Sequence, residues 1–572
     1  MDWPHGRVPD QRARRRGPQA RASCAHWLCL RPRRNPLRRG HRVPPLRGRE
    51  GREGPPHGVA QRQPLIHYGA RGHRDHAAGG KSPVSARGRS SAPLRGSGLT
   101  SSSPSRRRIV VVGGGISGLA AAYTLARARQ AGAPIEEYLL EGSPRWGGVI
   151  RTEKFDGFVI EGGPDSFLTE KPEAAALCRE LGLASHLLGS NDRERRTYIL
   201  HRGRLEPLPD GLYMLVPTRL WPLVRTPLLP ARSKLSALAE LFRRPSGDRA
   251  DESAASFVGR HFGPAMVQNI ADPLLAGVYG GDSENLSAPA VLPRFWRIEK
   301  ETGSLTRGVL RARRAHRREA ASAPLFTTLD GGLEELVRAL VERLEPSRLL
   351  LGQKVEVLET GARQPKGRPR WVVRVSEGAA IEADAVVLAL PAYESARLLA
   401  RADPVLAQRL GEIPYSSAVT VAFGFESKDV KLAPGHGLLV PRQERRRLLA
   451  VTFVHAKFPR RAPPGKLLLR CFLGGTRDPE IIGASDEEIV GWARKELAAI
   501  LGLRATPLFH RLTRSPQAMA QYTVGHLERL RAIEARVKQL PGLSLSGNAY
   551  SGIGISDCIR SGQAAAARAL SV

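Results

Sequence analysis

The most regular hydrophobic pattern in the chain begins at residue 109. Residues 109–112 (IVVV) are all aliphatic, which predicts a short buried strand of a parallel sheet. Three glycines and an alanine-rich run follow, and one face of that run repeats at helical spacing. This face carries Leu119, Ala122, Tyr123 and Ala126. A second run, "EEYLLE", ends at Glu141. The pattern therefore predicts a strand, a glycine turn, a helix and a second strand.

The glycine turn has the spacing of a dinucleotide-binding motif. Gly113 allows a tight turn, Gly115 lets the backbone approach a pyrophosphate, and Gly118 lets the helix pack on the strand. The helix N-terminus would face the diphosphate. Glu141 follows Gly118 by 23 residues and can accept hydrogen bonds from a ribose hydroxyl. These features predict a bound dinucleotide and leave NAD and FAD open.

Further glycine-rich stretches decide between the two cofactors by resemblance. "GSPRWGGVIRTEKFDGFVIEGGPDSF" (142–167), "LLLGQKVEVLE" (349–359), "ADAVVLALPA" (383–392) and "LSLSGNAYSGIGISDCIRSGQAAAARAL" (543–570) together resemble the flavin amine-oxidase superfamily. In that superfamily the second glycine turn runs beside the diphosphate, and the GGPDS stretch approaches the flavin. The resemblance therefore implies FAD. It assigns to the cofactor Gly113, Gly114, Gly115, Ile116, Ser117, Gly118, Glu141, Gly142, Arg145, Gly148, Val149, Gly163, Pro164, Asp165, Ser166, Val355, Ala549, Ile553, Gly554 and Ile555.

The last glycine-rich loop leads into a predicted C-terminal helix. We expect this helix to begin near Ser556 or Asp557, because both residue types are good N-caps. Its N-terminus would then stabilise the negative charge of reduced flavin through backbone N–H groups.

Alternating apolar and polar residues between 416 and 475 ("AVTVAFGF", "LLAVTF", "KLLLRCF") predict a mixed or antiparallel sheet. The fold class expected is α/β (α+β), with a Rossmann-like FAD-binding domain, a discontinuous substrate domain and an inserted helical lid. The predicted order is 1–106, a basic extension; 107–193, the first FAD-binding segment; 194–207, a substrate-domain hairpin; 208–322, the helical lid and membrane-contact insertion; 323–395, the second FAD-binding segment; 396–515, the substrate-binding sheet; and 516–572, the third FAD-binding segment.

One branch of the superfamily matches more than the flavin motifs. "ADPLLAGVYGGDSENLS" (271–287), "GLLVP" (437–441) and "KFPRRAPPGKLLLRCFLGG" (457–475) make the chain from 107 onward resemble the oxygen-dependent protoporphyrinogen and coproporphyrinogen oxidases of haem biosynthesis. The resemblance implies six-electron oxidation of a porphyrinogen to a porphyrin. It would proceed by successive hydride transfers to flavin N5, with molecular oxygen reoxidising the flavin and giving hydrogen peroxide. No catalytic base is evident. His455 is a weak candidate, because a lone histidine is more often structural.

The resemblance also places the substrate. Leu439 and Phe472 stand at positions that sandwich the macrocycle in the family. We expect Leu439, Thr452 and Phe472 to project from one face of the predicted sheet and to line the substrate slot. Thr452 stands where coproporphyrinogen oxidases of the Gram-positive type have threonine, which leans toward coproporphyrinogen III over protoporphyrinogen IX. Arg196 is the candidate propionate anchor, since arginine pairs bidentately with carboxylate. The alternative is a solvated basic turn at 193–196.

The stretch 208–230 mixes large apolar residues, arginines and prolines. Relatives use this region to cover the substrate channel and rest on a membrane. Trp221 and Tyr213 could lie at a lipid headgroup boundary, with Arg219 and Arg225 meeting anionic lipid. The alternative is that these residues are the core of an ordinary helical lid.

Charge changes the picture only at the start of the chain. Of the net charge of +35, residues 1–108 contribute 25 Lys and Arg against 5 Asp and Glu. Three interpretations remain open: a transit-like peptide, a basic arm for nucleic acid or anionic lipid, and translated GC-rich sequence upstream of a true start. We expect this segment to be poorly ordered, because it has no sustained hydrophobic period.

The remaining composition narrows the alternatives. Five scattered cysteines fit a reducing compartment and argue against a structural zinc site or a disulfide framework. No run of 18 apolar residues occurs. We therefore expect a cytoplasmic FAD enzyme, peripheral at the membrane or free of it, that acts on a porphyrinogen and oxygen and binds no nucleic acid. A homodimer remains open. The competing functions are an amine oxidase, a carotenoid desaturase and a non-enzymatic basic binding protein.

Overall fold

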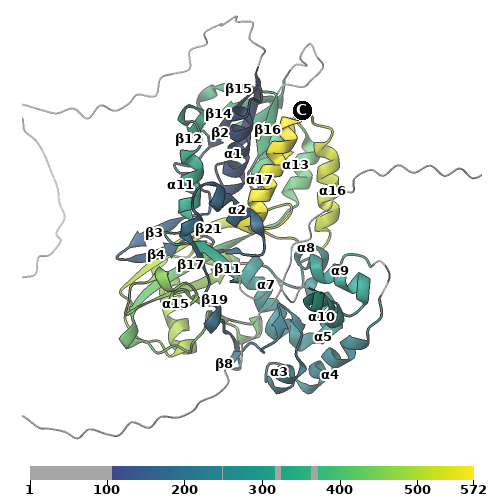
Figure 1. The fold of residues 1–572 in the computed structure, drawn as a ribbon, viewed down its shortest axis with the longest axis vertical. Coiled ribbons are helices and arrows are strands. Elements are labelled where there is room, and N and C mark those ends of the chain that lie inside the picture. Colours follow the sequence, from purple (N-terminus) through teal and green to yellow (C-terminus); the bar gives the residue numbers. More distant parts are fainter. Residues whose placement is uncertain (1–105, 246, 248, 316–323, 362–370, 572) are drawn as a thin grey trace, which may run out of the picture. The chain divides into compact units, whose positions relative to one another are not determined.

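The computed structural model describes residues 106–245, 247, 249–315, 324–361 and 371–571 (Figure 1). The basic segment 1–105 lies outside the described residues, so its three interpretations stay predictions.

A five-stranded parallel sheet forms the first layer, in the order β12-β2-β1-β16-β22. Its strands are β1 (Arg107–Val112), β2 (Ile135–Glu141), β12 (Leu349–Leu351), β16 (Ala385–Leu388) and β22 (Leu543–Leu545). Segments far apart in the chain thus share one sheet, as the sequence motifs predicted. The sheet confirms the Rossmann-like expectation, because every neighbouring pair is parallel and both faces are covered.

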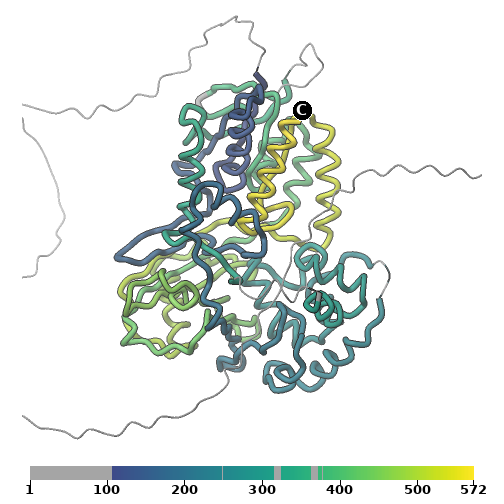
Figure 2. Tube along the Cα trace, viewed as in Figure 1, coloured from purple at the N-terminus to yellow at the C-terminus, as the bar shows by residue number. Residues whose placement is uncertain are grey.

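Helices α1 (Ile116–Gln130) and α17 (Ile555–Leu570) lie side by side, so the two ends of the described chain meet (Figure 2). Their close approach depends on Gly562: a Cβ there would come within 2.1 Å of the Ser117 carbonyl oxygen. At the far end, Arg107 donates to the Leu570 carbonyl over 2.8 Å. The first three turns of α1 are buried on nearly all sides, not on the one predicted face.

A second, seven-stranded sheet has the order β21-β17-β20-β19-β18-β7-β8. It is mixed, because β18 and β7 pair in parallel while the other neighbours are antiparallel. One face packs on helix α15 (Asp486–Leu501) through alternate residues such as Val421, Val451 and Cys471. The strands are β7 (Thr197–His201), β8 (Arg204–Pro207), β17 (Tyr415–Glu426), β18 (Gly437–Leu439), β19 (Leu448–Phe453), β20 (Lys466–Gly474) and β21 (Phe509–Ala520).

Helices occupy most of the segment between β10 and β11, and we call this segment the lid. They are α3 (Leu220–Arg225), α4 (Ala231–Ala239), α5 (Ala254–Phe262), α6 (Pro264–Met266), α7 (Asp272–Tyr279), α8 (Ala288–Val291), α9 (Pro293–Thr302) and α10 (Leu305–Ala315). A buried polar cluster ties them together: the His261 ring nitrogens lie 3.2 Å from Glu240 and from Glu299. His261 is thus bonded within the lid on both sides, which indicates a structural role.

Smaller elements complete the described chain. They are β3 (Thr152–Phe155), β4 (Phe158–Glu161), β5 (Phe167–Leu168), α2 (Pro172–Glu180), β6 (Leu187–Gly189), β9 (Leu212–Tyr213), β10 (Val216–Pro217), β11 (Phe326–Leu329), α11 (Glu334–Glu342), β13 (Val355–Thr360), β14 (Trp371–Val375), β15 (Ala380–Ala383), α12 (Ala392–Leu399), α13 (Pro404–Gly411), α14 (Val454–Lys457) and α16 (His526–Val537). Among the described helices, none has the length and apolar character needed to cross a membrane.

Candidate active site

Three glycine-rich turns converge at the carboxyl end of β1. Gly147 donates to the Gly114 carbonyl over 2.8 Å, and a bridge joins Gly115 to Gly147. The third turn touches the second, because a Cβ on Gly163 would lie 1.8 Å from the Val149 carbonyl oxygen. The stretches that the sequence assigned to FAD are therefore in direct contact with one another.

The first turn has the geometry that a diphosphate requires. Gly113 has φ +106°, and a Cβ there would lie 2.5 Å from the Ala389 carbonyl oxygen, so only glycine fits. A Cβ on Gly118 would clash with the Gly113 carbonyl oxygen at 1.8 Å. Gly115, in contrast, has open space where a side chain would stand. No side chain caps the N-terminus of α1, so its first amides are available to an anion.

Glu141 and Arg145 shape the rim of this cradle. Glu141 accepts hydrogen bonds from the Gly114 amide (2.6 Å) and the Ser143 amide (2.8 Å). The carboxylate therefore stands at the end of β2, where a ribose hydroxyl would meet it. Arg145 donates to three carbonyls of the second turn, those of Trp146, Gly148 and Ile150. Arg145 therefore organises the backbone of that turn.

The C-terminal loop differs from expectation at the helix start. Helix α17 begins at Ile555 after Gly554, and no side chain caps it, so the predicted caps Ser556 and Asp557 are wrong. Both side chains are engaged elsewhere: Ser556 donates to the Lys171 carbonyl, and Asp557 pairs with the Lys171 ammonium group. The amides at the start of α17 are left free of side-chain bonds, which suits a negatively charged flavin edge.

The other residues assigned to FAD differ in their exposure to solvent. Val149 is 53% exposed and Gly554 is exposed, so both are open to a ligand. Val355, Ala549 and Ile555 are buried, and Ile555 packs in the core beneath the parallel sheet.

The register of the seven-stranded sheet places the predicted substrate residues on one face. Leu439 pairs with Ala450, which pairs with Phe472 on the next strand. Two residues along, Thr452 pairs with Arg470. Since side chains alternate between faces with a period of two, Leu439, Thr452 and Phe472 share the face opposite α15. We call this the substrate face.

The GGPDS loop (162–166) lies directly on the substrate face. Arg470 donates to the carbonyls of Gly162 (3.0 Å) and Gly163. Thr420, in the same row as Phe472, donates to the Gly162 carbonyl over 3.3 Å. The Arg470 guanidinium carbon also lies 4.8 Å from the centre of the Phe472 ring. A single buried cation thus joins the loop assigned to the flavin and the residue assigned to the macrocycle.

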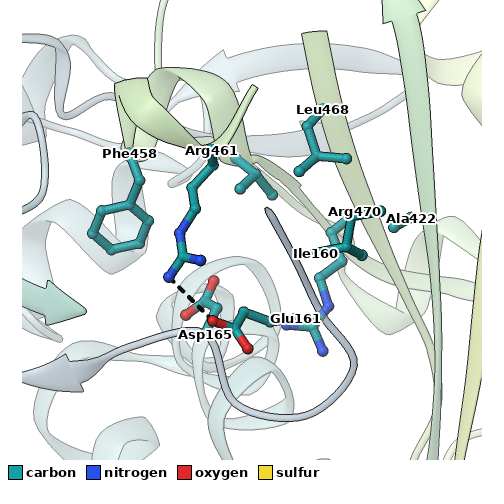
Figure 3. Close-up of a pocket in the computed structure, with 9 residues that line it drawn as sticks. Ile160, Glu161, Asp165, Ala422, Phe458, Arg461, Leu468 and Arg470 are labelled. Carbon is teal, nitrogen blue, oxygen red and sulfur yellow. Dashed lines mark ion pairs between the residues drawn. The ribbon is translucent and has the colours of Figure 1, made fainter. Parts of the chain in front are cut away.

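Buried charges surround this junction (Figure 3). The Lys457 ammonium group lies 3.2 Å from Asp165, and Arg461 lies 3.1 Å from Glu161. Burial alone would raise the pKa of Asp165, but Lys457 and Arg470 outweigh it and hold that pKa below its ordinary value. Burial raises the pKa of Glu161, and Arg461 opposes this only in part.

Charged and apolar side chains together line a small cavity at this junction, among them Ile160, Phe458, Leu468 and Arg461 (Figure 3). Among the described residues, the buried Arg461 Nη1 and Arg470 Nε atoms have no hydrogen-bond partner.

Residues 116–570 match the family model described as flavin containing amine oxidoreductase. The chain belongs to this family. It is 33% identical to the coproporphyrinogen III oxidase of Bacillus subtilis over 82% of this chain and 99% of that protein. It is 28% identical to the mitochondrial protoporphyrinogen oxidase of Nicotiana tabacum, over 80% and 94%. A crystal structure provisionally named protoporphyrinogen oxidase, from Exiguobacterium sp. 255-15, superposes with a TM-score of 0.71 at 30% identity, covering 81% and 98%.

Membership of the family makes the protein a flavin oxidoreductase with FAD as its cofactor. The touching glycine turns, the open position at Gly115 and the uncapped start of α1 fit this cofactor. These residues would hold the diphosphate and ribose, leaving the flavin ring for the GGPDS and 548–554 loops.

His455 and the proposed propionate anchor Arg196 stay predictions as site residues. The His455 Nδ1 atom lies 3.1 Å from the Leu468 carbonyl, and burial lowers the pKa of its imidazole. Arg196 is exposed just before β7. Thr197, not Arg196, pairs with Gly437 in the row that contains Thr452.

Helix α7 contains most of the motif "PLLAGVYGGD" and packs against one end of the substrate face. The sequence singled out this motif without assigning it a structural role. A Cβ on Gly277 would lie 3.4 Å from the Leu439 Cδ2 atom, so α7 crosses the substrate face at Leu439. Val278, on the same helix, is 54% exposed. Gly277 was not predicted to border the substrate face, although its motif was the most specific sign of the family branch.

Proposed function

We propose that this flavin oxidoreductase oxidises a porphyrinogen to the corresponding porphyrin in haem biosynthesis, with molecular oxygen as the final acceptor. One observation carries the proposal: a face of Leu439, Thr452 and Phe472 lies against the GGPDS loop through Arg470. A macrocycle standing on that face between Leu439 and Phe472 would lie next to the flavin. The names of the relatives support the same substrate class.

Bound FAD would supply the hydride acceptor, which the protein's own side chains cannot provide. Leu439 and Phe472 would hold the macrocycle from its two faces, and α7 would close the slot beside Leu439. Arg470 would hold the GGPDS loop, which is predicted to contact the flavin, at a fixed distance from Phe472. The pyrrole N–H groups and water would carry the protons, since no side chain is placed as a base.

Thr452 favours coproporphyrinogen III over protoporphyrinogen IX as the substrate. Its half-buried side chain lies on the substrate face next to Arg470. Threonine therefore gives the slot a hydroxyl at this position, where an aliphatic residue would make the wall apolar. A slot with a polar wall suits the more carboxylated macrocycle.

The test is aerobic incubation of the purified FAD-loaded protein with each porphyrinogen separately. Porphyrin fluorescence is followed against a no-enzyme control, because both substrates autoxidise, and hydrogen peroxide is measured in parallel. Acceleration with peroxide release supports the proposal, and the preferred substrate identifies the pathway step. Bound FAD without acceleration of either substrate would reject it and move amine or carotenoid oxidation to the front.

We propose in addition that α3 meets a membrane surface. Leu220, Trp221 and Val224 are 41%, 64% and 47% exposed, and Arg225 stacks on Trp221 at 4.5 Å. Tyr213 is buried and bonded to Arg294, so its predicted place at the headgroup boundary is wrong. Binding to anionic but not neutral vesicles, reduced in Trp221→Ala, would support the contact. Equal binding of the variant would reject it.

A further inference from the structure

Residues Gln521–Val524, between β21 and α16, form a strap along the lid. The Tyr522 carbonyl accepts a hydrogen bond from the Ser287 amide (2.8 Å), and the Val524 amide donates to the Asn285 carbonyl (3.0 Å). The Gln521 side-chain amide donates to the Tyr279 carbonyl at the end of α7 over 2.7 Å. The backbone and one side chain of the strap are therefore fixed to the lid.

The side chain of Tyr522 leaves the strap on its other side and reaches the loop before α17. Its hydroxyl donates to the Asn548 carbonyl (2.7 Å) and accepts from the Gly552 amide (2.9 Å). One oxygen thus clips both ends of residues 548–552. Burial raises the pKa of this phenol, so the hydroxyl keeps its proton and can serve as donor and acceptor together.

His526 fixes the orientation of the tyrosine ring. The two rings stack with centroids 4.1 Å apart and planes 12° apart. Burial, helped by Arg529, lowers the pKa of His526 to about 4, so the imidazole is neutral at physiological pH. It therefore supplies a flat uncharged surface for Tyr522 and is not a candidate proton donor.

We propose that Tyr522 is a positioning residue that couples α7 of the lid to the flavin loop 548–554. Through Gln521 and Tyr522, a shift of α7 at Tyr279 would be transmitted to the backbone of a loop that contacts FAD. The same helix carries Gly277, which lies against Leu439 on the substrate face, so the strap would link the position of α7 on that face to flavin geometry. The inference rests on the predicted flavin contact of this loop and not on the identity of the substrate.

The first test uses Tyr522→Phe, which keeps the stacked ring and removes only the clip. FAD release from the holoenzyme is followed by flavin fluorescence at a temperature well below global unfolding. We expect release to become faster by on the order of tenfold, the effect of losing about one net hydrogen bond or slightly more. Tyr198→Phe is the matched control. The Tyr198 hydroxyl, on β7 of the seven-stranded sheet, donates to the Pro434 carbonyl (2.9 Å), and this variant should release FAD like the wild type.

A thermal unfolding midpoint for each holoenzyme separates positioning from general stability. If Tyr522→Phe releases FAD at the wild-type rate, or only as the whole protein unfolds, the proposal is wrong. The coupling itself is tested with Gln521→Met and the double variant. Non-additive release rates support a strap that acts as one unit, and additive rates overturn it. These outcomes do not depend on porphyrinogen turnover, so they stand apart from the proposed function.

Discussion

Replacing Arg461 by methionine should destabilise the protein by about 3–5 kcal/mol, because it leaves a carboxylate buried without its partner. Arg461 is 1% exposed and lies 3.1 Å from Glu161. Its Nη2 atom also donates to the Thr328 hydroxyl (2.7 Å) and the Leu329 carbonyl (3.0 Å). Methionine would fill much of the space, so the loss would come from the unpaired charge and not from a cavity.

The pH dependence of this deficit has a definite sign. Burial raises the folded-state pKa of Glu161, and Arg461 is the group that opposes the rise. A carboxyl with a raised folded pKa takes up a proton on folding, so its contribution to stability falls as pH rises from its unfolded value toward its folded value. Without Arg461 the folded pKa rises further. The deficit of Arg461→Met should therefore be smallest at acid pH and grow toward neutrality.

Urea unfolding measured across that pH range tests the reasoning, with the free energy taken by linear extrapolation. The double variant Glu161→Gln, Arg461→Met removes both charges and should recover most of the loss, since replacing a whole buried pair is often close to neutral. A single-variant deficit below about 1 kcal/mol, a deficit independent of pH, or a double variant as unstable as the single one would refute the account.

Three further outcomes are expected. Glu141→Ala should weaken FAD binding by on the order of tenfold or more, measured by fluorescence titration, because the Gly114 amide and the ribose both lose their acceptor. Thr452→Leu should shift the ratio of rates toward protoporphyrinogen IX in paired porphyrin assays. Burial opposes ionisation of Glu299, but Arg260 and His261 lower its pKa to about 2; its contribution to stability is therefore present above its unfolded pKa and lost as pH falls toward 2. Thermal melts of Glu299→Gln between pH 6 and pH 2 should show a weaker acid dependence than the wild type.

The cofactor cradle could be predicted from the sequence because its signals are local. The spacing of Gly113, Gly115 and Gly118 specifies the turn by itself, although the distant Ala389 also closes in on Gly113. The common face of Leu439, Thr452 and Phe472 could be predicted for a similar reason. Once a sheet is assumed, the alternation of side chains with a period of two assigns each residue to one of its faces.

The charged junction could not be predicted in the same way. Arg470 and Gly163 are 307 residues apart, and neither has a neighbour that indicates the other. The one available signal was the arginine inside the apolar strand "LLLRCFL", since a buried cation needs acceptors. The predicted start of α17 was wrong for another reason. Ser556 and Asp557 are good caps by residue type, but both side chains bind Lys171, which is distant in the sequence.

The cations and the carboxylates of the charged junction come from opposite sides, and this arrangement aligns the GGPDS loop with the substrate face. The three cations Lys457, Arg461 and Arg470 come from β20 and the segment before it. Of their two carboxylate partners, Glu161 directly precedes the GGPDS loop and Asp165 lies within it. An apolar contact of the same area would allow the loop to slide over the sheet, because hydrophobic burial is non-directional. Hydrogen bonds between guanidinium groups, carboxylates and loop carbonyls hold only at one register. The buried charges therefore fix the register of the GGPDS loop on the substrate face, at a cost in desolvation that an apolar junction would not have.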